Sequence, residues 1–105
     1  MSPTLDDVQY GFAGTAEAAL PDDGFALIRE AEGLTLVGPG KGWARITLGV
    51  HSSLDAIGLT ARISAALTAR GISANVVAAL HHDHVFVPWE RREEAMAALR
   101  ALATE

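Results

Sequence analysis

The chain of 105 residues contains no cysteine, which excludes a disulfide scaffold, a thiolate zinc site and a cysteine nucleophile. Basic side chains are few, 8 against 13 acidic ones, so the clustered Lys and Arg that bind a nucleic-acid backbone are missing. No apolar run approaches the roughly 20 residues that cross a bilayer. Acidic residues stand near the N-terminus where a signal peptide needs basic ones. We therefore expect a soluble, cytoplasmic protein with neither a nucleic-acid nor a membrane partner.

What the chain does have is apolar residues, which make up 50% of it and indicate one folded domain rather than a disordered segment. Its formal net charge of -5 is unevenly spread. Residues 1–42 hold seven acids and two bases, whereas residues 43–105 hold six of each. We therefore divide the chain into an acidic N-terminal arm, residues 1–42, and a charge-balanced domain, residues 43–105.

Turn-forming residues interrupt the acidic arm, with short apolar pieces between them. Residues 25–28 and 34–37 are rich in strand formers and flank a polar stretch that ends in glycine, so we expect a β-hairpin. Residues 8–12 predict a further short strand, and residues 15–20 predict a helical turn or a loop. The glycine- and proline-rich residues 38–42 predict a linker.

The remainder of the chain has regular periodicities. Alternation of apolar and polar residues predicts strands over 43–50 and 72–80, and a short strand over 84–87. Apolar residues at helical spacing predict helices over 54–70 and 90–103. This order, β-α-β-β-α, supplies five of the six elements of the ferredoxin-like motif.

The expected fold class is therefore α+β, a ferredoxin-like antiparallel sheet with two helices on one face. Its last edge strand is absent, and we expect the N-terminal β-hairpin of residues 25–37 to complete the sheet. No helices remain to cover the second face of the sheet, so the hairpin or a partner subunit should bury part of it. That face carries Arg45, Thr47, Ser73, Asn75 and Val77.

Three separated runs resemble the ACT-domain superfamily: ITLGVHSSLDAIGLT (46–60), GISANVVA (71–78) and HHDHVFVP (81–88). Together with EAEGLTLV (30–37), they are most similar to a small bacterial branch of stand-alone ACT proteins of uncharacterised function. The resemblance implies a non-enzymatic regulatory domain without a cofactor. It also implies a small-molecule ligand, most often an amino acid, bound between two ACT units and hence a homodimer.

The resemblance also implies where the ligand lies, between the loop that opens the first helix and the end of the next strand. In that loop, Gly58 allows close approach to the helix N-terminus, and Asp83 matches an acidic position that contacts the ligand. Leu80 replaces an aromatic residue of some relatives, which leaves the identity of the ligand open. The candidate ligand-binding residues are Ser52, Ser53, Ile57, Gly58, Leu59, Asn75, Ala79, Leu80 and Asp83.

Physical chemistry supports a free amino acid as the ligand, although each residue also has a structural alternative. A helix N-terminus favours a carboxylate, Asp83 suits an amino group, and Asn75 offers both a donor and an acceptor. Alternatively, Gly58 permits close packing, Asn75 bonds a neighbouring strand and Asp83 is a turn residue. The two serines are also typical helix N-caps.

The run from His81 to His84 resembles a metal cluster, but alternation along an extended chain separates His82 and His84 from His81 and Asp83. We therefore expect solvent-facing histidines and no metal, unless His51 adds a ligand. Neither a G-x-S-x-G nor a phosphate-loop motif is present. The alternatives to a ligand-binding regulatory domain are a structural or protein-interaction module without ligand, and a metal-binding protein that uses this turn.

Overall fold

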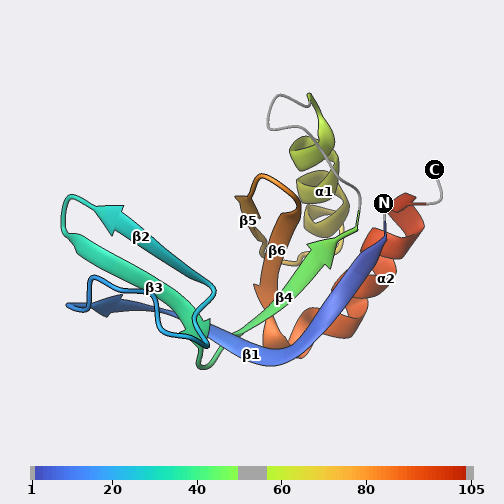
Figure 1. Cartoon of the computed structure of the whole chain (residues 1–105). Helices are drawn as coiled ribbons and strands as arrows, with labels where there is room; N and C mark the ends of the chain where they lie inside the picture. The colour runs from blue at the N-terminus through green and yellow to red at the C-terminus, as the bar shows by residue number, and fades with distance from the viewer. Residues whose placement is uncertain (1, 50–56, 104–105) are drawn as a thin grey trace.

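The computed structural model describes residues 2–49 and 57–103, which form a six-stranded antiparallel sheet with two helices (Figure 1). The strand order is β2-β3-β1-β4-β6-β5. The strands are β1 (Pro3–Thr15), β2 (Ala26–Glu30), β3 (Gly33–Pro39), β4 (Trp43–Leu48), β5 (Asn75–Ala78) and β6 (Asp83–Pro88). The helices are α1 (Leu59–Thr68) and α2 (Arg92–Ala103), the latter preceded by a 3-10 turn, η1 (Trp89–Arg91).

The main core lies between the helices and one face of the sheet. Along β4 every second residue is buried, and Ala44, Ile46 and Leu48 point to the helices. They meet apolar side chains of α1 and α2, which repeat at helical spacing. The periodicities of the sequence therefore identified this layer correctly: α+β, with an antiparallel sheet and both helices packed in the core on one face.

The strand that pairs with β4 at the expected edge of the ferredoxin-like unit is β1, not the hairpin. The first half of β1 pairs with β4, from Pro3 opposite Leu48 onward, while its second half, Tyr10–Thr15, pairs with β3. The pairing with β4 shifts register between Leu5 and Gln9, an irregularity that typically bends a strand. The hairpin of β2 and β3 forms as expected, but it extends the far half of β1 and projects away from the helices (Figure 1).

The expected linker is shorter than the glycine-rich run suggests. Gly38 and Pro39 belong to β3, so only residues 40–42 connect β3 to β4. Two backbones pass closely here, since a Cβ atom on Gly40 would lie 3.1 Å from the amide nitrogen of Gly11. Gly40 therefore allows the two backbones to pass close to each other, rather than making the connection flexible. Residues 16–20 contain no helix, so the loop alternative holds there.

We expect Gly40→Val to lower the free energy of unfolding by about 1–3 kcal/mol, because the new side chain meets backbone that cannot move away. Gly14→Val is the matched control, since a Cβ atom there meets nothing within 4 Å and should change stability by less than about 0.5 kcal/mol. Urea denaturation of both variants checks this. Equal effects at the two positions would contradict the close approach at Gly40.

The sheet face opposite the helices, here called the open face, carries a second cluster. Tyr10, Val37 and Phe86 are buried in it. Phe25, just before β2, packs edge-to-face on Phe86 with ring centroids 5.4 Å apart. Part of the open face is thus covered by residues of the chain's own N-terminal region. Within the described residues, no helix has the length and apolar character required to cross a membrane.

Candidate functional site

One end of the sheet brings together several of the residues expected to bind the ligand. There β5 turns into β6, and the Ala79 amide donates to the His82 carbonyl at 3.1 Å. The turn lies against the end of β4, because the His82 ring nitrogen Nδ1 is 3.1 Å from the Leu48 carbonyl oxygen. Helix α1 also starts at this end (Figure 1). It is preceded by Gly58, which has the left-handed backbone angle φ of +92° that glycine adopts most readily.

The candidate residues differ in where they lie and how exposed they are. Gly58, Ala79, Leu80 and Asp83 belong to this end of the sheet. Leu80 is 66% exposed and Ile57 fully exposed, whereas Leu59 packs partly into the core. Ser52 and Ser53 lie outside the described residues.

Asn75 lies apart from Asp83. It begins β5 and pairs with Phe86, on the open face, whereas Asp83 pairs with Ala78 at the other end of the strand. Because side chains alternate along β6, Asp83 points to the opposite face from Phe86. The two side chains are therefore separated by the sheet itself.

Asp83 has an unusual environment for a carboxylate. It is 7% exposed, and among the described residues it is the one charged side chain that is buried. Burying a carboxylate is costly unless it is paired or hydrogen-bonded, and Asp83 is not without a partner. Asp83 lies beside the turn and on the helix-bearing side of the sheet, and its role as an acidic ligand contact stays a prediction.

The open face contains a polar network that we call the Arg45 cluster: Asp6, Tyr10, Arg45, Thr47 and His84. The Arg45 guanidinium donates through Nη2 to Asp6 Oδ2 at 2.7 Å, and the Tyr10 hydroxyl donates to the same oxygen at 2.7 Å. On its other side, Arg45 Nη1 lies 3.4 Å from Nδ1 of His84. The cluster therefore ties β1, β4 and β6 together through side chains.

Burial and neighbouring charges perturb three pKa values in the cluster. Burial by itself would raise the pKa of Asp6. The hydrogen bonds from Val8, Arg45 and Tyr10, together with the charge of Arg45, have a larger opposite effect, so the pKa of Asp6 is lowered. Burial and the hydrogen bond to Asp6 raise the pKa of Tyr10. Burial, with the positive charges of Arg45 and His82, lowers the pKa of His84.

Sequence reasoning missed Asp6 and Tyr10 as partners of Arg45. Arg45 and Thr47 were expected on the uncovered face, but no motif indicates that Asp6, 39 positions away, pairs with Arg45. The one available signal was a charged residue, Arg45, in the middle of a strand with one buried face. Such a residue in a sheet usually has a partner of opposite charge.

The histidines of the β5–β6 turn do not form a three-ligand group with other described residues. The rings of His82 and His84 are 6.4 Å apart and bond to Leu48 and Thr47 respectively. No three His, Asp or Glu side chains within residues 2–49 and 57–103 are placed to hold a metal ion. His51 lies outside the described residues.

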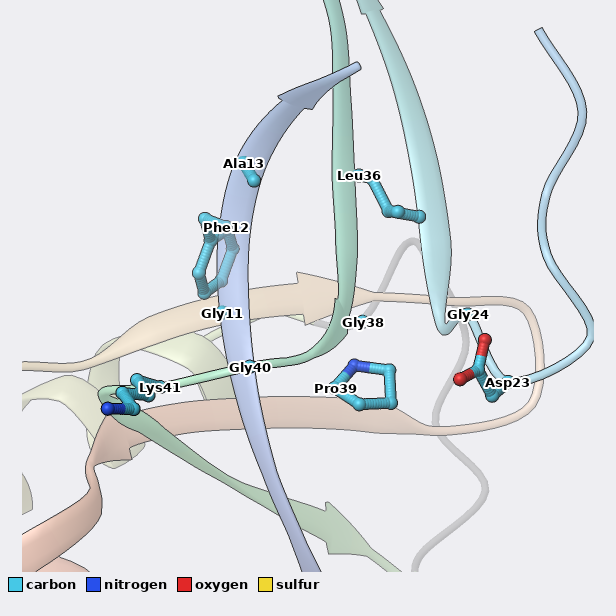
Figure 2. Close-up of a pocket in the computed structure, with 10 residues that line it drawn as sticks. All are labelled: Gly11, Phe12, Ala13, Asp23, Gly24, Leu36, Gly38, Pro39, Gly40 and Lys41. Carbon is cyan, nitrogen blue, oxygen red and sulfur yellow. The ribbon is translucent and has the colours of Figure 1, made fainter. Parts of the chain in front are cut away.

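A shallow hollow of about 340 Å³ opens beside the crossing of β1 and β3 (Figure 2). Gly11, Gly38 and Gly40 line it, with Asp23 and Lys41 toward opposite ends. Because glycines make up much of its wall, the hollow offers backbone more than side chains. It belongs to the acidic arm and the start of the connection to β4.

Comparisons with known proteins agree with this fold. Residues 40–101 match the ACT domain family. A crystal structure of a protein of unknown function from Vibrio cholerae, described as a possible transport protein, superposes with a TM-score of 0.83 at 42% identity. The match covers 93% of this chain and 86% of that one, and no curated protein matches. The chain therefore belongs to the ACT domain family.

Proposed function

We propose that this protein is a non-enzymatic regulatory module that binds a free amino acid as a homodimer. ACT domains are in general regulatory and bind small molecules, which sets the class of function. The amino acid, the binding residues and the dimer are our proposal. The observation that carries it is the buried carboxylate of Asp83 at the end of the sheet where α1 begins.

The chemistry of this end suits a zwitterion. Asp83 is an acceptor for an α-amino group, and a bond between two ions is stronger than one between neutral groups. The first backbone N–H groups of α1 have no acceptor within the helix and attract a carboxylate. Gly58 presents no Cβ atom to a ligand approaching that terminus. The exposed Leu80 and Ile57 are available to a ligand side chain or to a second subunit.

A thermal-shift screen of the twenty amino acids tests the ligand. At 100 times its dissociation constant, the bound amino acid should add about 2.7 kcal/mol to the free energy of unfolding. Asp83→Asn should abolish the shift, because the amide no longer neutralises the amino group. Glu93→Gln, which removes an exposed acid of α2, should retain it.

Two outcomes contradict this proposal. If none of the twenty amino acids stabilises the protein, the chain is better described as an interaction module. If one of them stabilises wild type and Asp83→Asn equally, an amino acid binds elsewhere.

Sedimentation tests the homodimer. At micromolar concentration, sedimentation equilibrium should give a molecular mass of twice the chain mass of 11.0 kDa, because the implied ligand site lies between two ACT units. The free edge strands β2 and β5 and the exposed apolar residues Phe12 and Ile28 offer surfaces for contact. A single species at the monomer mass, with and without the amino acid identified by the screen, would contradict the dimer.

A further inference from the structure

Phe25 connects the segment before β2 to the Arg45 cluster. Its ring lies 4.7 Å from the Arg45 guanidinium carbon and 4.8 Å from the centre of the His84 ring. Its amide donates to the Val37 carbonyl at 2.8 Å, which fixes the point where the segment joins the hairpin. The two residues before it, Asp23 and Gly24, form a wall of the hollow. A contact that fixes the position of Phe25 therefore also fixes Asp23 and Gly24 at the wall of the hollow.

The position of His84 requires its neutral form. A guanidinium only donates hydrogen bonds, so the contact of 3.4 Å from Arg45 Nη1 makes Nδ1 of His84 an acceptor. Thr47 Oγ1 lies 3.0 Å from the same nitrogen. A proton on Nδ1 would remove the acceptor and place a second positive charge against Arg45. The hydroxyl of Thr47 is able to reverse its role, but the guanidinium is not.

Arg45 is held in place, so it is His84 that must move when it becomes charged. Asp6 accepts from Arg45 at 2.7 Å, and Tyr10 and the Val8 amide donate to Asp6. The other charged groups acting on His84 are His82 and Asp83, on the same turn. From β5, the residue paired with His84 is Val77, which carries no charge.

We propose that His84 is a pH-operated latch: neutral, it holds Phe25 over the open face, and protonated, it releases Phe25 together with the wall of the hollow. On release, the contact between His84 and Arg45 is lost, and the ring of Phe25 loses His84 as a packing partner. Phe86 and Tyr10, which pack against Phe25, then become more accessible. The latch acts on the N-terminal region and does not depend on the ligand proposed above.

The direction of the pKa shift agrees with this. The pKa of His84 is lowered from its ordinary 6.5 because burial, Arg45 and His82 disfavour the charged form. The stabilisation from neutral His84 is thus complete above about pH 6.5 and is lost as the pH falls through the lowered pKa. Asp6 remains ionised throughout this range, because its hydrogen bonds and Arg45 lower its pKa from the ordinary 3.8. Its ion pair with Arg45 is therefore constant while His84 titrates.

Amide hydrogen exchange of the Phe25 N–H, measured by NMR and corrected for the intrinsic rate, tests the latch. Between pH 7.5 and a pH at which the His84 ring resonances show the protonated form, the protection factor in wild type should fall by about tenfold, the scale of one lost hydrogen bond to a charged group. The fall should follow the titration of His84 itself, read from its ring resonances. His84→Asn, whose amide oxygen takes the place of Nδ1 and does not titrate, should show no fall.

His81→Asn is the matched control, since it removes an exposed histidine of the same turn and should leave the wild-type behaviour intact. The latch is refuted if wild-type protection is the same at both pH values, or if it follows the titration of His81 or His82 instead. An equal fall in His84→Asn also refutes it. If the variant does not fold, the comparison of Phe25 protection with the titration of His84 in wild type is sufficient to test the latch.

Discussion

Replacing Phe86 with alanine should lower the free energy of unfolding by about 3–5 kcal/mol. The side chain is fully buried, and its ring packs edge-to-face with those of Tyr10, Phe12 and Phe25 at centroid distances of 5.3–5.8 Å. Two of these rings belong to β1 and one to the segment before β2, so a cavity at Phe86 weakens the joint between the hairpin and the rest of the sheet. Denaturation by urea, followed by circular dichroism, measures the loss.

Ile57→Ala is the control for this substitution. Ile57 is a large apolar residue that is fully exposed, so its truncation should change stability by less than about 0.5 kcal/mol. Since a domain of this size has only about 5–15 kcal/mol in total, the Phe86 variant should unfold at visibly lower urea. A loss below about 1 kcal/mol would show that the aromatic cluster does not contribute to global stability.

Deleting residues 2–9 should be at least as damaging, with an expected loss of about 4 kcal/mol or more. The deletion removes most of the ladder between β1 and β4, in which each hydrogen bond contributes about 0.5–1.5 kcal/mol. It also removes Leu5 from the edge of the core and Asp6 from Arg45. A partly buried Arg45 without its partner adds a further cost. Thermal unfolding of the truncated chain measures the total loss of stability.

The truncation also tests the division of the chain at residue 42. If the acidic arm were a separate unit, the charge-balanced domain should unfold as before when residues 2–9 are absent. The pairing of Pro3–Leu5 with β4 predicts the opposite. Thr4→Ala, which leaves the backbone ladder intact at an exposed position, should retain the wild-type transition and thereby control for a change at the N-terminus.

Within residues 43–49 and 57–103, the order of strands and helices could be predicted from the sequence because their apolar periodicities are clear, although β5 (Asn75–Ala78) is shorter than the strand expected over 72–80. The strict alternation along β4 and the apolar stripe of α1 each reflect a single buried face. The pairing partner of β1 could not be found in the same way. β1 is a strand of 13 residues, but only residues 8–12 show a clear alternation of apolar and other residues. Asp6 and Asp7 near its start, and its glycines, interrupt the pattern elsewhere.

Candidate ligand-binding residues could be named from the sequence only where a family pattern exists, and they stay a prediction. Asp83 and Gly58 could be named from the resemblance, and the structure places both at one end of the sheet. The Arg45 cluster has no such pattern, because its members come from three strands and meet only after the sheet bends. Distances between side chains on different strands follow from register, and register depends on the whole set of pairings.

The pairing of the first strand with the fourth also affects how the chain is made. Pro3 leaves the ribosome before its partner Leu48 has been added. At about 5–20 residues per second, the delay is about 2–9 seconds. During that time the edge of β1 that faces β4 has no strand to pair with, and Leu5 is exposed to other chains. Synthesis therefore includes an interval in which the β4-facing edge of β1 is open to chaperones and to neighbouring nascent chains.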